Sequence, residues 1–241
     1  MFADMTMIKT TLAEQAYQEL RSRIVTGRLP GGQRLLPSEL AIDLGISQTP
    51  VKEACLRLEA DGLVLTSSRR GMIVRSFTEA DVVELYAART LLEKGAVEAA
   101  FDAGNIDDGL VRSLKESLKQ HRHFANGSSL DDLSKALSHD RAFHMALVAA
   151  AKIPMISETH TRIIGQTHTV FVSVPGDYKR SVEEHEKILS AIISQDKALI
   201  IAALTQHLER SRLNTLHQAR LLAEQLETSA PLWIGARNGV S

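Results

Sequence analysis

The sequence contains few of the residues that stabilise secreted or membrane-spanning proteins. One cysteine, Cys55, occurs among 241 residues, which excludes an intrachain disulfide and fits a reducing compartment. No run of about 18 apolar residues is present, as a transmembrane helix would need, and no signal-peptide pattern opens the chain. We therefore expect a cytoplasmic protein without a membrane partner.

The chain also lacks an excess of charge of either sign. Its formal net charge is −1, which gives no overall signal for nucleic acid. The charge is nevertheless unevenly distributed: residues 1–76 hold ten Lys and Arg against eight Asp and Glu, whereas the remainder holds 18 against 21. A slightly basic first part and an acidic remainder fit a protein that contacts DNA through one domain.

Two short helices around a glycine corner are predicted within residues 39–61. Gly45 supplies the turn, and Ser47 stands where its hydroxyl can cap the second helix. That helix has four apolar residues at helical spacing, namely Val51, Ala54, Cys55 and Leu58. Its other faces leave four polar residues for solvent or DNA, namely Gln48, Thr49, Lys52 and Arg57. The pattern is typical of a helix-turn-helix, although any corner between two helices would look alike.

The segment that follows decides between these two interpretations. Residues 63–66 and 72–75 have strand character and flank a glycine-containing turn that carries Arg69 and Arg70. A hairpin with a basic tip directly after a helix-turn-helix predicts a winged helix, whose tip suits contact with DNA phosphates. We therefore expect residues 11–76 to bind DNA.

Beyond residue 77 the sequence predicts only helices. Six segments have helical periodicity, at about residues 78–103, 108–126, 129–151, 154–172, 181–195 and 196–226. The predicted fold is mainly α, with an N-terminal winged helix-turn-helix domain and a C-terminal all-α antiparallel bundle of about six helices. The predicted divisions are a flexible tail (1–10), the DNA-binding domain (11–76), the helical domain (77–227) and a C-terminal tail (228–241).

Ionisable residues interrupt the apolar faces of four of these helices. The five residues are Arg89, Asp140, His144, His185 and His207. A buried charge without a partner costs several kcal/mol, so these groups need one another or a ligand. Three imidazoles and a carboxylate suit Zn²⁺, with Ni, Mn and Fe as other candidates. The alternative is that each histidine is a core residue bonded to backbone, and periodicity alone leaves both open. His121, His123 and His217 are expected in solvent, and His160 and His168 in an ordinary core.

Residues 11–76 resemble the DNA-binding domain of the GntR family of bacterial transcription regulators. The resemblance rests on motifs that include Gly31-Gly32-Gln33-Arg34-Leu35, Leu44-Gly45-Ile46-Ser47, Thr49-Pro50-Val51-Lys52-Glu53-Ala54, Leu58-Glu59-Ala60-Asp61-Gly62-Leu63 and Arg70-Gly71. The expected DNA contacts are Ser47, Gln48, Thr49, Lys52, Arg57, Arg69, Arg70 and Gly71. Gln48 stands where such proteins usually have arginine, so the operator sequence cannot be carried over.

Residues 77–219 resemble the helical effector domain of the FadR branch of that family. The matching segments are Asp140-Arg141-Ala142-Phe143-His144, Glu184-His185 and His207-Leu208, together with Arg89 in the first helix. The resemblance implies a divalent metal held by Asp140, His144, His185 and His207. It also implies a small carboxylic acid as effector, bound with the help of Arg89. Ile153 replaces the asparagine that such proteins commonly have before the proline.

The function we expect is that of a ligand-responsive transcription regulator in the bacterial cytoplasm, associated with the nucleoid. It would be a repressor released by a small carboxylic acid. A homodimer is expected because one winged helix offers few base contacts and two-fold symmetry doubles them. The alternative is a metal-dependent hydrolase, since an Asp/His₃ metal site could activate water. A hydrolase would need a further base, and Glu93, the nearest candidate, is more simply the partner of Arg89. We therefore expect no enzymatic activity.

Overall fold

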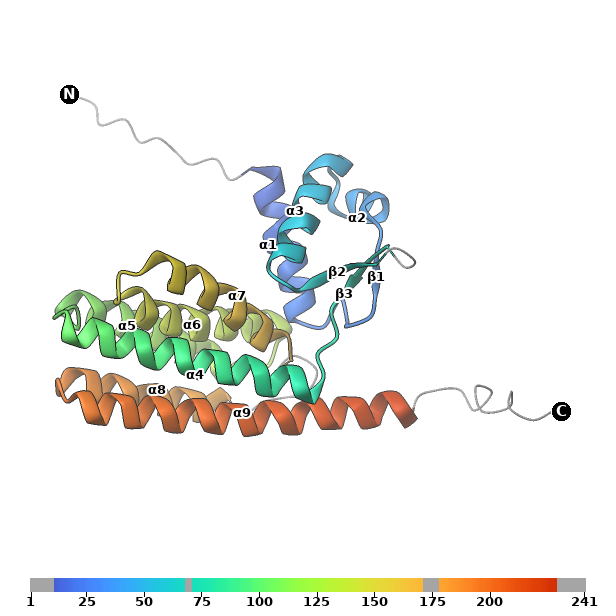
Figure 1. Ribbon diagram of the computed structural model, residues 1–241. Helices are drawn as coiled ribbons and strands as arrows, with labels where there is room; N and C mark the ends of the chain where they lie inside the picture. The colour runs from blue at the N-terminus through green and yellow to red at the C-terminus, as the bar shows by residue number, and fades with distance from the viewer. Residues whose placement is uncertain (1–10, 68–70, 171–177, 229–241) are drawn as a thin grey trace, which may run out of the picture. The chain divides into compact units, whose positions relative to one another are not determined.

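The computed structural model describes residues 11–67, 71–170 and 178–228 (Figure 1). The chain divides into two compact units, residues 1–76 and residues 77–241. Each unit has a hydrophobic core of its own. The mainly α fold class, with a winged helix-turn-helix followed by a helical bundle, is confirmed.

The first unit is a winged helix-turn-helix. Its helices are α1 (Leu12–Val25), α2 (Pro37–Leu44) and α3 (Gln48–Ala60). The strands β1 (Arg34–Leu35), β2 (Val64–Ser67) and β3 (Gly71–Val74) form an antiparallel sheet in the order β1-β3-β2. The apolar face predicted for the second motif helix, Cys55 included, lies in the core of this unit. The sequence does not predict β1, whose two residues form a strand by pairing with β3.

The corner between α2 and α3 differs in one detail from the prediction. Gly45 ends α2 with a φ of 66°, a left-handed conformation that glycine adopts without a steric cost. Ser47 does hold the N-cap position of α3, but its hydroxyl makes no capping hydrogen bond, so that expectation was wrong. A capping side chain accepts from the second or third helical amide, and the third residue here is Pro50, which has no N–H.

The second unit is a bundle of helices. They are α4 (Glu79–Asp102), α5 (Asp108–Ala125), α6 (Leu130–Ala149), α7 (Pro154–Val170), α8 (Tyr178–Ile193) and α9 (Lys197–Thr228). Thr78 and Ser129 each form a reciprocal capping box, with Asp81 and Asp132 respectively. The fifth bundle helix was expected to begin at about residue 181, but it includes Tyr178. Ser181 donates its hydroxyl to Asp140 on α6.

Helix α4 brings one face to the bundle and leaves another exposed. It packs against α6, α7 and α9, and Figure 1 shows it running antiparallel to α9. Helices α5 and α8 complete the main core together with α6 and α9. Within the described residues, no helix has both the length and the apolar character needed to cross a bilayer. The polar side chains of α4, α6, α8 and α9 therefore meet inside a packed helical core.

Candidate functional site

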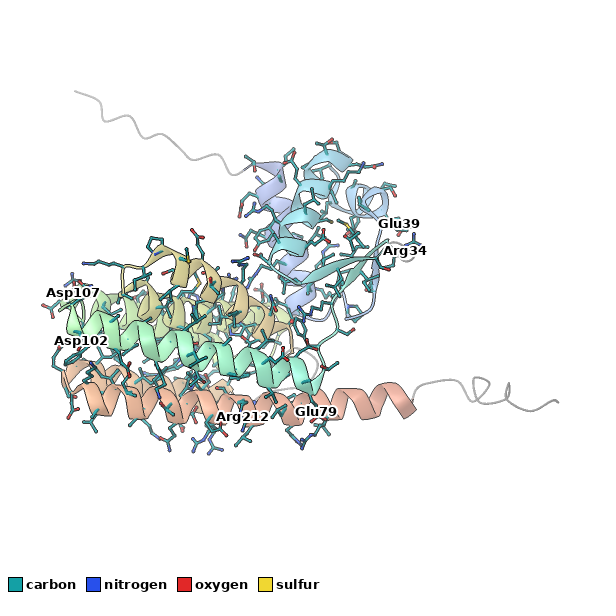
Figure 2. All side chains as sticks on the ribbon, viewed as in Figure 1. Arg34, Glu39, Glu79, Asp102, Asp107 and Arg212 are labelled. Carbon is teal, nitrogen blue, oxygen red and sulfur yellow. The ribbon has the colours of Figure 1, made fainter. Side chains whose placement is uncertain are left out.

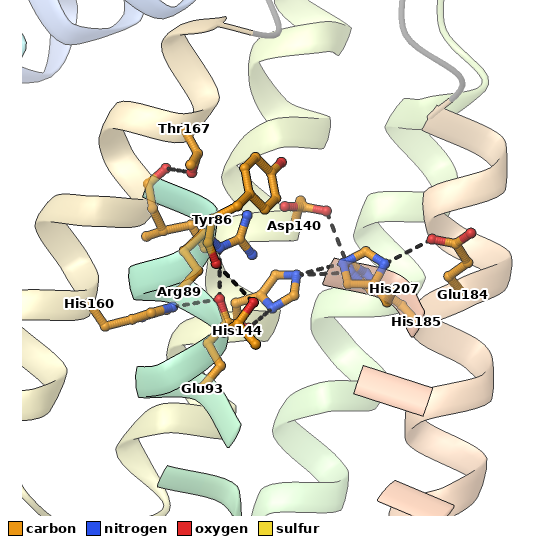
Figure 3. A network of polar contacts seen from close by, with 12 residues as sticks. Tyr86, Arg89, Glu93, Asp140, His144, His160, Thr167, Glu184, His185 and His207 are labelled. Carbon is orange, nitrogen blue, oxygen red and sulfur yellow. Dashed lines mark hydrogen bonds and ion pairs between the residues drawn. The ribbon is translucent and has the colours of Figure 1, made fainter. Parts of the chain in front are cut away.

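Four helices bring ionisable side chains to one place in the bundle (Figure 3). Arg89 comes from α4, Asp140 and His144 from α6, His185 from α8 and His207 from α9. Arg89 and the three histidines are buried, with His144 and His185 fully enclosed. The structure thus brings together the residues that interrupt the apolar faces in the sequence.

The three imidazoles converge through their Nε2 atoms. The Nε2 atom of His144 lies 3.1 Å from that of His185 and 3.1 Å from that of His207. Two nitrogens that bind one ion at about 2.1 Å are separated by about 3.0 Å at octahedral angles and about 3.4 Å at tetrahedral angles. The observed spacing therefore fits three ligands of a single divalent ion.

Two carboxylates determine which ring nitrogen carries the proton in His144 and in His207. Glu93 accepts from Nδ1 of His144 at 2.7 Å, and Glu184 accepts from Nδ1 of His207 at 2.9 Å. Burial opposes ionisation of Glu93, but the Arg89 charge and the His144 bond outweigh it and hold the pKa of Glu93 well below its usual value. Burial also lowers the pKa of His144, so its ring stays neutral.

Because these protons lie on Nδ1, neither of the two facing Nε2 atoms can donate a hydrogen bond to the other. A neutral imidazole with its proton on Nδ1 presents a lone pair at Nε2. The Nε2 lone pairs of His144 and His207 therefore point at each other inside the core. A metal ion satisfies such an arrangement, and metal-bound histidines usually donate their other N–H to a carboxylate, as both do here.

Asp140 lies at the edge of the histidine group. Its Oδ1 atom is 3.6 Å from Nε2 of His185, and its two oxygens accept from His168 at 3.0 Å and from Ser181 at 3.1 Å. The ligand atoms of the three histidines lie within 4.8 Å of one another, whereas Asp140 shares such a group with His185 and His121. These bonds hold Asp140 beside the three imidazoles rather than among them.

Arg89 is buried with one part of its guanidinium unsatisfied. Its Nε donates to Glu93 at 2.8 Å, which is the pair expected from the sequence. Its Nη2 atom, however, is buried and has no hydrogen-bond partner in the structure. An unsatisfied buried donor costs about 1–3 kcal/mol, so this nitrogen marks a place for an acceptor that the protein itself does not supply.

A cavity of about 120 Å³ adjoins Arg89 and one of the three histidines, His207. Its walls are formed by α4, α6, α8 and α9. The lining residues are Arg89, Leu137, Asp140, Tyr178, Arg180, Ser181, Glu184, His207, Arg210, Ser211 and Asn214. The cavity joins the unsatisfied Arg89 nitrogen to the rim of the histidine group.

Three further histidines belong to this network, and two expectations about them were wrong. His121 was expected in solvent, but it is only 1% exposed and its ring lies 5.4 Å from that of His185. His160 and His168 are not ordinary core residues, because they bond to Glu93 and Asp140. Burial lowers the pKa of His121 and brings that of His168 down to about 4. His123 and His217 are exposed, as expected.

The start of α3 presents the expected DNA contacts in the first unit. Four of these residues, all exposed, lie there: Ser47, Gln48, Thr49 and Lys52. Arg57 faces α1 instead, where it pairs with Glu14 at 2.5 Å and lies 4.1 Å from the centroid of the Tyr17 ring. Arg57 therefore links α3 to α1.

The wing is described only in part. Arg69 and Arg70 lie outside the described residues, and Gly71, with a φ of +71°, opens β3. The sequence reading did not single out Arg34, an exposed cation on β1 whose guanidinium lies close to Gly71 (Figure 2). Strand pairing between β1 and β3 brings the two together, which the sequence pattern could not reveal.

Comparison with known families gives a match for each unit. Residues 12–74 match the model described as "Bacterial regulatory proteins, gntR family". Residues 84–210, more than half of the chain, match the model described as "FCD domain".

Curated relatives carry the names of transcription regulators. The chain is 30% identical over 213 residues to the "Probable D-xylose utilization operon transcriptional repressor" of Paenarthrobacter nicotinovorans, covering 88% of this chain and 92% of that protein. It is 28% identical over 210 residues to the gluconate operon transcriptional repressor of Bacillus subtilis, covering 83% and 84%. Among solved structures, E. coli McbR/YncC has the same fold, with a TM-score of 0.72 at 22% identity over 87% of this chain and 99% of that one.

Proposed function

This chain belongs to the GntR family of bacterial transcription regulators, and we propose that it is a repressor controlled by a small carboxylic acid. In this proposal a homodimer binds operator DNA through its winged helices. The helical unit holds a divalent metal, and the acid binds beside that metal and lowers the affinity for DNA. The names of two relatives, which call them repressors of sugar-related operons, support the sign of regulation.

The proposed DNA interface is the N-terminal end of α3. The second helix of a helix-turn-helix reads the major groove with the residues near its start. Gln48 and Thr49 are exposed there and can bond to base edges, whereas Lys52 is placed to meet a phosphate. Arg34, on the sheet, is a further candidate for phosphate contact. Arg57 also remains a proposed phosphate contact, because its side chain is 49% exposed and its surface pair with Glu14 is weak enough to be exchanged for DNA.

The proposed dimer is supported by an exposed apolar stripe on α4. Val83, Ala87, Leu91 and Gly95 recur every fourth residue, and all four are exposed. The side chain of Leu91 is 76% exposed, and a contiguous apolar stripe, unlike a single exposed leucine, marks an interaction surface. No atom lies within 4 Å of the position that a Cβ would take on Gly95, so another helix can approach closely. A stripe with this spacing suits helix packing against a second copy.

The observation that carries the metal proposal is the convergence of three imidazoles, with Nε2 of His144 3.1 Å from Nε2 of His185 and 3.1 Å from Nε2 of His207. A bound divalent ion would supply the positive charge that these nitrogens require. Asp140, 3.6 Å from His185, is the proposed fourth ligand. Zinc is the first candidate because the ligand set is rich in imidazole.

The acid is assigned by Arg89. A guanidinium donates two parallel N–H groups to a carboxylate, and the buried Nη2 atom of Arg89 lacks any acceptor. The same residue lines the cavity that reaches His207. A hydrolase is not favoured, because the base that it would need is engaged: Glu93 accepts from Arg89, His144 and His160.

The test is the affinity of metal-loaded protein for a duplex obtained by selection from random sequences, measured by fluorescence anisotropy with and without small carboxylic acids. At least one acid is expected to weaken binding by about tenfold or more, a coupling within the usual range. Arg89→Lys, which keeps a positive charge for Glu93, should keep its metal content and its affinity for the duplex but lose most of the response, because lysine cannot donate two parallel bonds to a carboxylate. A response of Arg89→Lys equal to that of the wild type would contradict the proposal.

A further inference from the structure

We propose that His121, Asp140 and His185 form a second position for the divalent ion, next to the first position at His144, His185 and His207. This inference rests on the proposed metal and adds to it a ligand, His121, that the proposed four-residue site does not include. The ion occupies the second position when the first cannot hold it. Both positions use His185, so one ion occupies one or the other.

His121 is a buried polar side chain without a partner. It lies on α5, is 1% exposed and continues the apolar spacing of Leu114 and Leu118. Its Nδ1 atom is enclosed and has no hydrogen-bond partner in the part of the chain that the structure describes. Burial lowers the pKa of His121, so the ring is neutral and carries a lone pair on one nitrogen. Buried polar atoms are normally satisfied, and a metal ion can provide the partner that this ring lacks.

The surroundings of His121 supply the other ligands. The ligand atoms of His121, Asp140 and His185 lie within 4.8 Å of one another. The two ring centroids are 5.4 Å apart, and Oδ1 of Asp140 lies 3.6 Å from Nε2 of His185. Two ligands at about 2.1 Å from one ion are about 3.0 Å apart at right angles and about 4.2 Å apart on opposite sides. Small rotations of these side chains therefore close the group around an ion.

His185 is the imidazole that can serve either position. Glu93 and Glu184 keep the protons of His144 and His207 on Nδ1. The buried Nδ1 atom of His185, by contrast, has no hydrogen-bond partner among the described residues. Its ring can therefore present a lone pair at either nitrogen. A neutral imidazole has one such lone pair, so His185 binds one ion at a time.

The ligand set of the second position suits zinc but predicts weaker binding than at the first. Two imidazoles and a carboxylate are three protein ligands, which leave a coordination position for water. Asp140, with 14% of its side chain exposed, lines the cavity, so water can reach an ion bound there. The first position has one more imidazole and therefore holds the ion when it is intact.

The test removes a ligand that belongs only to the first position. His207→Leu replaces the imidazole with an apolar side chain of similar size, and Glu184 keeps its ion pair with Arg210. Zinc is titrated by calorimetry into full-length protein freed of metal by a chelator, and bound zinc is counted by mass spectrometry. His207→Leu should still bind one zinc ion, more weakly than the wild type.

His121 is then removed in the same background. Adding His121→Leu to His207→Leu should lower the zinc affinity by at least about tenfold, because even the loss of an outer-shell partner of a ligand typically costs 10–100-fold. The matched control adds His123→Leu, an exposed histidine on the same helix, and should leave the affinity unchanged. His121→Leu alone should keep the zinc affinity of the wild type. Zinc should also raise the Tm of His207→Leu, which confirms that the ion binds the folded protein.

Anomalous diffraction from zinc-loaded crystals of His207→Leu locates the ion. The expected peak lies about 2.1 Å from one nitrogen each of His121 and His185 and from an oxygen of Asp140. A peak that stays beside His144 instead would overturn the inference.

The binding outcomes separate this inference from the metal proposal on which it rests. If the wild type binds no zinc, the metal proposal itself fails. If the wild type binds zinc but His207→Leu does not, or binds it equally with and without His121, only the second position is overturned. Loss of zinc from His121→Leu alone would also overturn it, because His121 would then belong to the first position. Should His207→Leu not fold, His144→Leu takes its place, since Glu93 keeps two other bonds.

Discussion

Glu93 is the residue on which the buried charges of the bundle depend. It is fully buried on α4 and accepts from Nε of Arg89 at 2.8 Å, from His144 at 2.7 Å and from His160 at 3.0 Å. The same carboxylate balances the Arg89 charge and sets the tautomer of His144. The Arg89 charge at the proposed acid site and the His144 tautomer at the proposed metal site therefore both depend on Glu93.

Replacing Glu93 with glutamine should destabilise the metal-free protein strongly. The substitution keeps the shape but leaves the Arg89 guanidinium buried without a counter-charge, which typically costs about 3–5 kcal/mol. Urea denaturation, followed by circular dichroism, measures the change. Glu98→Gln, at an exposed position of the same helix, is the control and should leave the unfolding midpoint unchanged. A loss below about 1 kcal/mol would mean that water, rather than Glu93, compensates Arg89.

The sequence reveals some residues of this network and hides others. Arg89, His144 and His207 are visible because each interrupts a regular apolar face. His121 could have been found in the same way, since it continues the spacing of Leu114 and Leu118 on α5. Glu184 could not, because it neighbours His185 in the chain and reaches the site only through its bond to His207. Contacts between distant helices are not encoded in the periodicity of either one.

Local hydrogen bonds explain which element boundaries the sequence predicts. The capping boxes at Thr78 and Ser129 join residues three apart, so the chain signals them directly. Strand β1 has two residues and exists through its pairing with β3, and Ser181 lies inside α8 and bonds to Asp140 on α6. Both depend on partners far away in the sequence, where propensity gives no information.

The exposed stripe of α4 leads to a prediction about association. Leu91→Arg should convert the proposed dimer to a monomer, because a charge in the middle of an apolar helix contact has no partner there. Sedimentation velocity measures the outcome. Leu199→Arg, which changes a comparably exposed leucine on α9, is the matched control and should leave the dimer intact. Dissociation by the control alone would place the contact on α9 instead.

The whole molecule combines a winged helix-turn-helix unit and a helical unit, each with its own core. The order of helices and strands predicts this division, because the winged motif ends where strand signals cease. The operator and the effector are not predictable in this way, since they depend on a few exposed or cavity-lining side chains. If the acid lowers operator affinity, then operator DNA must lower acid affinity by the same factor.

The metal connects these proposals, and anomalous X-ray diffraction tests it most directly. Crystals of protein purified without chelator and supplied with zinc are measured on both sides of the zinc absorption edge. One anomalous peak is expected about 2.1 Å from the Nε2 atoms of His144, His185 and His207. Density without such a peak, with the three imidazoles in direct contact, would contradict this expectation.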